Sequence, residues 1–172
     1  MLKSAKQLAA EIEAEYVSIR FDQAASSPPS NWIQHPVYQT YLIDLTSNPD
    51  ELLKKFSSDH RNHIRKSLKK NFKIRFGHLD LLDDAYEAIA KSMHELGSPY
   101  HSKTYLKKMA EYLGETLEFA VTYDSRGKIT GAGVFIYQGK TIFNLHANIL
   151  HFARSTYAGE FLYWSVIEHA IQ

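Results

Sequence analysis

Apolar residues recur along this chain at two spacings, every three to four positions and every second position, and these spacings predict its elements. Residues 4–15 have the helical spacing, and residues 16–21 read as a short strand. Residues 24–36 are rich in Ser and Pro and have no period, so we interpret them as a linker. Residues 37–172 would then form the main domain.

The main domain reads as strands and helices that fit one α+β fold. Short loops between the later strands favour a mostly antiparallel sheet with helices packed on it. The predicted strands are 37–45, 72–76, 117–123, 129–137 and 141–147, and the predicted helices start at 48 and span 79–96, 102–113 and 160–171. Gly131 and Gly133 lie inside one strand, where we expect a bulge or a close approach of backbone or ligand.

Residues 48–75 are the most distinctive stretch of the sequence. They open like one continuous helix, because Asn48 can cap it and Pro49 suits its first position. The expected apolar stripe of this helix comprises Leu53, Phe56, His60, Ile64 and Leu68. Residues 54–75 hold nine Lys or Arg and one acid, a net charge of +8 in a chain whose net charge is +1.

The charge of this segment favours a polyanionic partner. Arg61, Arg65 and Lys69 recur every four residues, where like charges repel, and no matching row of acids offsets them. Phosphates, a nucleic-acid backbone or an anionic lipid head group would do so. The two arginines can also fork onto a phosphate, which Lys cannot do. A solvated helix face is the alternative for any single Lys.

Composition removes several function classes. The chain has no Cys, which excludes disulfides and thiolate catalysis and fits a reducing compartment. No apolar run approaches the roughly 20 residues of a membrane span, and the acid-containing N-terminus is unlike a signal peptide, so we expect a cytoplasmic protein. His60 and His63 lie near Asp59 without a clear third ligand, so we expect no metal site.

Three motifs resemble the FemAB-related proteins, in particular the group associated with PEP-CTERM and exosortase systems. They are R-N-H-I-R-K-S-L-K-K at 61–70, S-M-H-E-L-G-S-P-Y at 92–100 and F-L-Y-W-S-V-I-E-H-A at 161–170. The resemblance covers residues 37–172 and implies a GNAT-like (acyl-CoA N-acyltransferase-like) fold that lacks its C-terminal strands. Residues 1–23 would be the trailing helix and strand of a preceding GNAT-like half. An incomplete sheet leaves an exposed edge, so we expect either a homodimer that pairs through this edge or weak stability.

The resemblance implies transfer of an acyl or aminoacyl group to an amine-bearing precursor in cell-envelope, peptidoglycan or exopolysaccharide biosynthesis. The donor would be aminoacyl-tRNA or acyl-CoA, with no permanently bound cofactor. Two alternatives stay open: a non-catalytic anion- or nucleic-acid-binding module on a partial GNAT fold, and an acetyl-CoA-dependent acetyltransferase. Residues 154–159 match the coenzyme A loop only in part, and Tyr157 at the expected first Gly argues against the acetyltransferase.

The resemblance and the chemistry together select the candidate site residues. His146, expected on one strand face with Ile142 and Asn144, could deprotonate the amine, the alternative being an ordinary sheet histidine. His94 and Tyr100 flank a turn and are predicted to line the acceptor pocket, unless they only pack helices. The predicted substrate- and phosphate-binding residues are Arg61, Arg65, Lys69, Arg154 and Gly159.

Overall fold

The computed structural model describes residues 2–18, 32–33, 41–45 and 48–171, and the chain divides into two units after Asp44. In the first unit, α1 (Leu2–Glu11) is the helix predicted for residues 4–15, and it ends four residues earlier than expected. Residues 16–18 do not form the start of the predicted strand, whose other residues lie outside the described ones, as does most of the predicted linker.

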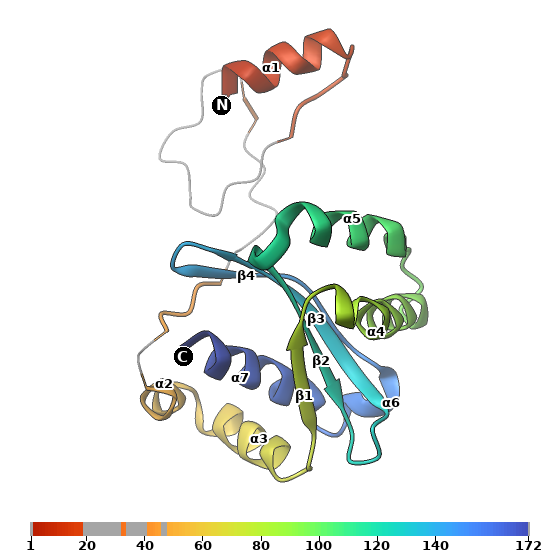
Figure 1. The fold of residues 1–172 in the computed structure, drawn as a ribbon. Coiled ribbons are helices and arrows are strands. Elements are labelled where there is room, and N and C mark those ends of the chain that lie inside the picture. The colour runs from red at the N-terminus through yellow and green to blue at the C-terminus, as the bar shows by residue number, and fades with distance from the viewer. Residues whose placement is uncertain (1, 19–31, 34–40, 46–47, 172) are drawn as a thin grey trace. The chain divides into compact units, whose positions relative to one another are not determined.

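The second unit is built on one antiparallel sheet of four strands in the order β1-β2-β3-β4 (Figure 1). The strands are β1 (Lys73–Gly77), β2 (Leu117–Tyr123), β3 (Ile129–Gln138) and β4 (Thr141–Ile149). They confirm the strands predicted from residue 72 onward. The strand predicted at 37–45 is wrong over residues 41–45, which are irregular and exposed, while 37–40 lie outside the described residues. Alternating apolar residues there find no partner strand in the described sheet.

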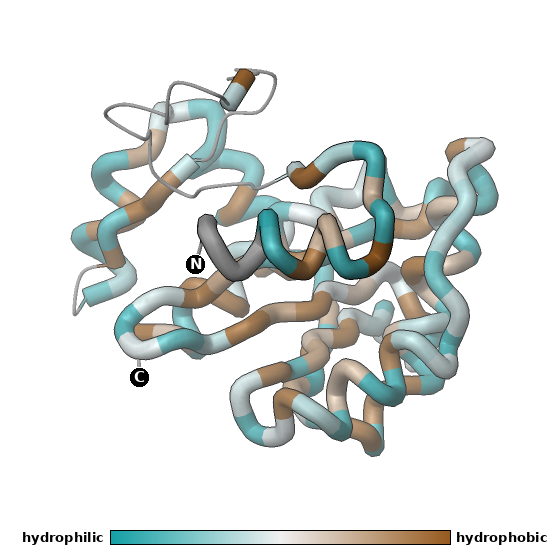
Figure 2. The backbone as a smooth tube through the Cα atoms, turned by 90° about the horizontal axis from the view of Figure 1, so that it is seen from above, coloured by the Kyte–Doolittle hydropathy of each residue, from teal (hydrophilic) through white to brown (hydrophobic). Residues whose placement is uncertain are grey.

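Helices cover both faces of the sheet, which confirms the predicted α+β class (Figure 1). On one face, α4 (Leu82–Glu95), preceded by the short η1 (Leu79–Leu81), and α5 (Lys103–Leu113) pack on β2 and β3. On the other, α7 (Ala158–Ile171) packs on Ala120 and Phe135. Hydrophobic and hydrophilic residues alternate along the helices, as one-sided burial requires (Figure 2). Two short turns, η2 (Gly114–Thr116) and α6 (His151–Arg154), complete the unit.

The basic segment forms two helices and not the single one predicted. In α2 (Pro49–Lys55), Asn48 Oδ1 accepts from the Asp50 N–H at 2.9 Å, as the sequence predicts for a cap. Ser57 then caps a new helix, α3 (Ser58–Leu68). This break changes the helical register, so the expected stripe is partly wrong. The buried residues are Leu52, Ile64 and Ser67, whereas His60 and Leu68 are exposed.

Aromatic contacts hold α2 and α3 against α7. Phe56, at the break between the two helices, meets Trp164 edge-on with ring centroids 6.2 Å apart. Phe72, just before β1, lies 5.4 Å from Phe161. The basic segment is therefore attached to the sheet through α7, and its charged residues remain at the surface.

Gly131 of β3 allows β4 to approach closely, and Gly133 leaves room for the Phe135 ring of its own strand. A Cβ at Gly131 would lie 2.7 Å from the Asn148 carbonyl oxygen, and one at Gly133 would lie 2.5 Å from the Phe135 ring. Backbone cannot yield as a flexible side chain can, so Gly131 is the more restrictive position. The close approach expected from the sequence is thus one of backbone.

We predict that Gly131→Ala lowers the free energy of unfolding by about 1–3 kcal/mol, since β4 must move to admit the methyl group. Gly159→Ala is the control, because its Cβ would meet only Ile149, at 3.6 Å, and it should change stability by less than about 1 kcal/mol. Chemical denaturation of both variants checks this. Equal stability of the two would contradict the close β3–β4 packing.

Candidate functional site

A pocket of about 300 Å³ brings together two residues predicted from the sequence, His146 and Tyr100. Met93 at the end of α4, with Pro99 and His101 from the segment before α5, completes its lining. We call it the histidine pocket. His94, predicted to share it, is exposed and does not line it. The sequence does not single out Met93 or His101, because only tertiary packing places them beside β4: Met93 through α4, and His101 through the return of the chain after Pro99.

A bulge in β4 turns His146 toward this pocket. His146 pairs with Val134, but Phe135 pairs with Asn144, so Leu145 is an extra residue. His146 therefore shares the α4 face with Val134, while Asn144 donates to the Tyr163 hydroxyl of α7 at 3.0 Å. The expectation that His146 shares a face with Ile142 and Asn144 is wrong. It assumed regular alternation of side chains along the strand, and the extra residue shifts that alternation by one position.

The surroundings of His146 favour its neutral imidazole. Burial lowers the pKa of His146, and the neighbouring His101 lowers it further. The two imidazole centroids are 6.0 Å apart, and the Tyr100 ring meets His146 edge-on at 5.3 Å. At neutral pH His146 is thus able to accept a proton.

The Tyr100 hydroxyl is buried without a hydrogen-bond partner, the one such side-chain atom in the part of the chain that the structure describes. Burial raises its pKa to about 12, with smaller contributions from Tyr105 and Tyr86, so it stays protonated. A buried donor without an acceptor costs about 1–3 kcal/mol. A ligand oxygen in the pocket would recover that free energy.

A hydrogen-bond network holds α4, which carries Met93, against the end of β4. The Ser92 hydroxyl donates to the Ile149 carbonyl at 3.2 Å, and Asn148 Nδ2 donates to Ser92 Oγ at 3.4 Å. Arg154 joins it, with Nε 3.1 Å from the Ile149 carbonyl and Nη2 3.3 Å from Ser92 Oγ. Arg154 thus stabilises the packing of α4 against the end of β4, next to the histidine pocket. Its contact with a phosphate stays a prediction.

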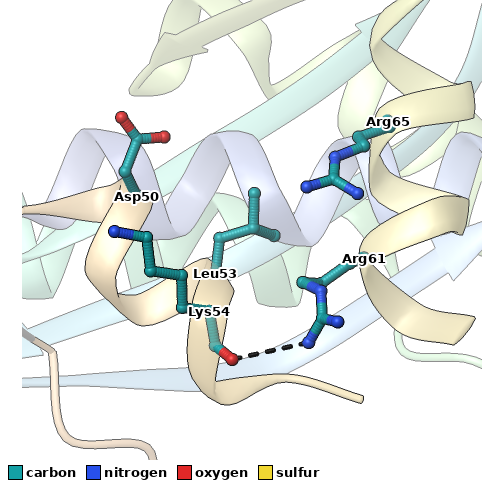
Figure 3. Close-up of a pocket in the computed structure, with 5 residues that line it drawn as sticks. All are labelled: Asp50, Leu53, Lys54, Arg61 and Arg65. Carbon is teal, nitrogen blue, oxygen red and sulfur yellow. Dashed lines mark hydrogen bonds between the residues drawn. The ribbon is translucent and has the colours of Figure 1, made fainter. Parts of the chain in front are cut away.

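A second pocket, of about 420 Å³, lies between α2 and α3, and we call it the arginine groove (Figure 3). Arg61 and Arg65 reach into it from α3, and α2 supplies the rest of the lining: Asp50, Leu53 and Lys54. The Arg61 guanidinium donates to the carbonyls of Phe56 and Lys54, so it closes the C-terminal end of α2. Arg65 is exposed and bonds to no described residue, which leaves it available for an anion.

The remaining predicted phosphate residues lie apart from the groove. Lys69 is the C-cap of α3 and does not line it. Gly159 lies in the first turn of α7, two residues after Tyr157. Tyr157 adopts φ 65°, a left-handed conformation that favours Gly. Its ring packs 4.9 Å from His63, and its hydroxyl is 3.5 Å from Lys66 Nζ.

His63 joins α3 to the start of α7. Its ring nitrogens lie 3.5 Å from an Asp59 oxygen and 3.4 Å from a Glu160 oxygen.

No group of metal-ligating side chains suited to an ion is present among the described residues. None of the helices in the described part of the chain has the length and apolar character needed to span a bilayer.

Comparison with known proteins adds the family. The sequence model of the FemAB family matches residues 33–124, slightly more than half of the chain, including the arginine groove and Tyr100 but ending before β4. No curated protein matches in sequence.

Solved structures show the fold. FemX is 11% identical with a TM-score of 0.65, over 72% of this chain and 47% of its own. The C-terminal domain of a proposed lysylphosphatidylglycerol synthetase from Agrobacterium fabrum is 13% identical with a TM-score of 0.50, over 69% and 40%. A GNAT family acetyltransferase from Staphylococcus aureus is 16% identical at 0.44, over 58% and 77%. This chain thus spans about half the length of FemX and shares its fold.

We predict different effects for the two arginines of the groove. Arg61→Ala should lower the free energy of unfolding by about 1–2 kcal/mol, because the last carbonyls of α2 lose their donor. Arg65→Ala should change it by less than about 0.5 kcal/mol, since Arg65 bonds to no described residue. Parallel urea titrations measure both. Equal losses would show that Arg65 is structural and not free for a ligand.

Proposed function

Because the chain belongs to the FemAB family, we propose that it acts in N-acyl transfer, moving an acyl or aminoacyl group to an amine acceptor used in the cell envelope or an exopolysaccharide. The observation that carries the proposal is the pairing, in one pocket, of a neutral imidazole on His146 with the unpartnered hydroxyl of Tyr100. Acyl transfer to an amine needs a base and an oxyanion donor, and it needs no side-chain nucleophile.

In the proposed reaction, His146 takes a proton from the acceptor amine as its nitrogen attacks the donor carbonyl. The carbonyl oxygen becomes negative in the tetrahedral intermediate and accepts the hydrogen bond of Tyr100. The intermediate then breaks its bond to the leaving oxygen or sulfur, which takes the proton back from His146. The products are an amide and a free hydroxyl or thiol, and His146 is neutral again.

For the donor we propose aminoacyl-tRNA, with acyl-CoA as the alternative. Arg65 offers a free guanidinium for a phosphate in the arginine groove, which lies on the α7 face of the sheet, while the histidine pocket lies on the α4 face. Such a separation suits a large polyanion that contacts several parts of the surface. Charged tRNA and acetyl-CoA are the two probes, and phosphate contacts make tRNA binding weaken steeply between about 50 and 200 mM salt.

The same separation supports a second candidate, a non-catalytic module that holds an anion in the arginine groove. In that case Arg65→Ala would weaken tRNA binding, and no substitution in the histidine pocket would alter any turnover. A turnover assay with charged tRNA and an amine acceptor decides between the two functions.

We predict that Tyr100→Phe lowers turnover about a hundredfold, as removal of one oxyanion donor does, without lowering stability. Stability should stay equal or rise, because the variant removes a buried hydroxyl that has no acceptor. Tyr112→Phe, at an exposed position on α5, is the matched control and should keep full turnover. Unchanged turnover in Tyr100→Phe would eliminate its hydroxyl as the donor.

We predict that turnover falls on acidification only below pH 6.5, the ordinary His pKa, because the pKa of His146 is lowered and its neutral form is the active one. His101→Asn removes the second cause of that shift and should move the acid limb upward, while burial keeps it below 6.5. His146→Gln should remove the limb with most of the turnover. If the acid limb of the pH–rate profile does not move in His101→Asn, the assignment of that limb to His146 is contradicted.

A further inference from the structure

Basic residues also gather at the end of the sheet where α3 runs into β1. Lys69, Lys70 and Lys73 follow one another there, all exposed. Their ammonium groups form no ion pair with any acid of the described chain. They lie outside the arginine groove.

The sheet brings a second basic segment to the same end. Lys73 pairs with Tyr123, and the β2–β3 turn, residues 124–128, follows directly. This turn carries exposed Arg126 and Lys128, and Lys128 Nζ lies 3.9 Å above the ring of Phe152 on α6. Figure 1 shows the end of α3, the β2–β3 turn and α6 at this one end of the sheet.

The acids at this end include Asp124, whose Oδ2 forms an ion pair with Arg126 Nη2 at 3.7 Å. Asp124 Oδ1 accepts the backbone N–H groups of Arg126 and Lys128, both at 2.9 Å. Glu95 Oε2 accepts the His151 backbone N–H at 3.1 Å. The positive excess of this surface comes from its four lysines, at 69, 70, 73 and 128, which form no ion pair with a described residue.

Two large exposed apolar side chains belong to elements at the same end of the sheet. Leu68 is 47% exposed in the last turn of α3, next to Lys69, and Phe152 is 43% exposed beside Lys128. Isolated exposed apolar residues are common, but these two stand within the basic cluster. We call this surface, comprising Leu68, Lys69, Lys70, Lys73, Arg126, Lys128 and Phe152, the basic end face.

We propose that the basic end face docks the protein on an anionic membrane surface, with the lysines on lipid phosphates and Leu68 and Phe152 in the interface. Charge complementarity alone would also suit a nucleic acid. The apolar residues decide between them, because a phosphate backbone gains nothing from Leu68, whereas a bilayer interface removes it from water. The docking would bring the fold to membrane-anchored acceptors, and its test needs no turnover.

The test is co-sedimentation of the 172-residue chain with vesicles. One set contains about one third phosphatidylglycerol in phosphatidylcholine, and the other is pure phosphatidylcholine. We expect binding to the anionic set, weakened by salt as screening shortens the reach of the charges, and little binding to the neutral set. Absence of binding to the anionic vesicles at low salt overturns the proposal.

A charge-reversal pair locates the surface. Lys70→Glu with Lys73→Glu should weaken binding at least thirtyfold, since each Lys near an anionic surface contributes about 1 kcal/mol. The control is Lys107→Glu with Lys108→Glu, the same charge change at exposed positions on α5. Equal weakening by the two pairs would mean that only net charge matters, and the basic end face would lose its role.

An apolar substitution separates lipid from nucleic acid. Leu68→Ser should weaken vesicle binding about tenfold, and Leu79→Ser, at a position 45% exposed at the opposite end of β1, should have no effect. Circular dichroism melting confirms that each variant is folded. Two results together would assign the surface to nucleic acid and overturn the proposal. In the first, Lys70→Glu with Lys73→Glu abolishes binding of bulk tRNA. In the second, Leu68→Ser leaves vesicle binding unchanged.

Discussion

The pairing of β3 with β4 is the constraint on which the candidate active site depends. Gly131 lets the two backbones approach, and the extra residue at Leu145 then reverses which face the rest of β4 presents. His146 consequently faces α4 and the segment that carries Tyr100. Without the bulge, the same strand would direct His146 toward α7. The chemistry proposed for this chain therefore rests on one inserted residue in an edge strand of the described sheet.

Most of the fold follows from local pattern, and its exceptions share one physical cause. The meander from Leu117 to Ile149 and the helices α4 and α5 have strong periods that tertiary packing does not oppose. The break at Ser57 and the bulge at Leu145 are single-residue events, which leave the average period unchanged and shift everything after them. Residues 41–45 fail for a different reason, because a strand needs a partner and a sequence period cannot supply one.

The site was predictable as residue types and not as an arrangement. His146 and Tyr100 were selected through resemblance and chemistry, and the structure places them together. No sequence motif points to His101, because it lowers the pKa of His146 only through their proximity in the folded pocket. Arg61 was predicted to bind phosphate, but in the structure its guanidinium donates to the Phe56 carbonyl at the end of α2. Part of its hydrogen-bonding capacity is therefore used within the fold. Which polar atom is left without a partner is a property of packing, and the sequence cannot reveal it.

The basic residues of the segment 54–75 lie in different parts of the fold, which the net charge of the segment does not show. Seven of the nine basic residues within 54–75 precede the strand predicted at 72–76, and they would repel one another along the single helix that the sequence predicts. The break at Ser57 and the end of α3 at Leu68 divide the nine basic residues between two helices, a turn and a strand, so they diverge. Arg61 stabilises α2, Arg65 faces an open groove, and the lysines after Leu68 reach the end of the sheet. One charged segment can in this way serve the fold, an anionic substrate and a surface for docking, and substitutions at each position should separate the three.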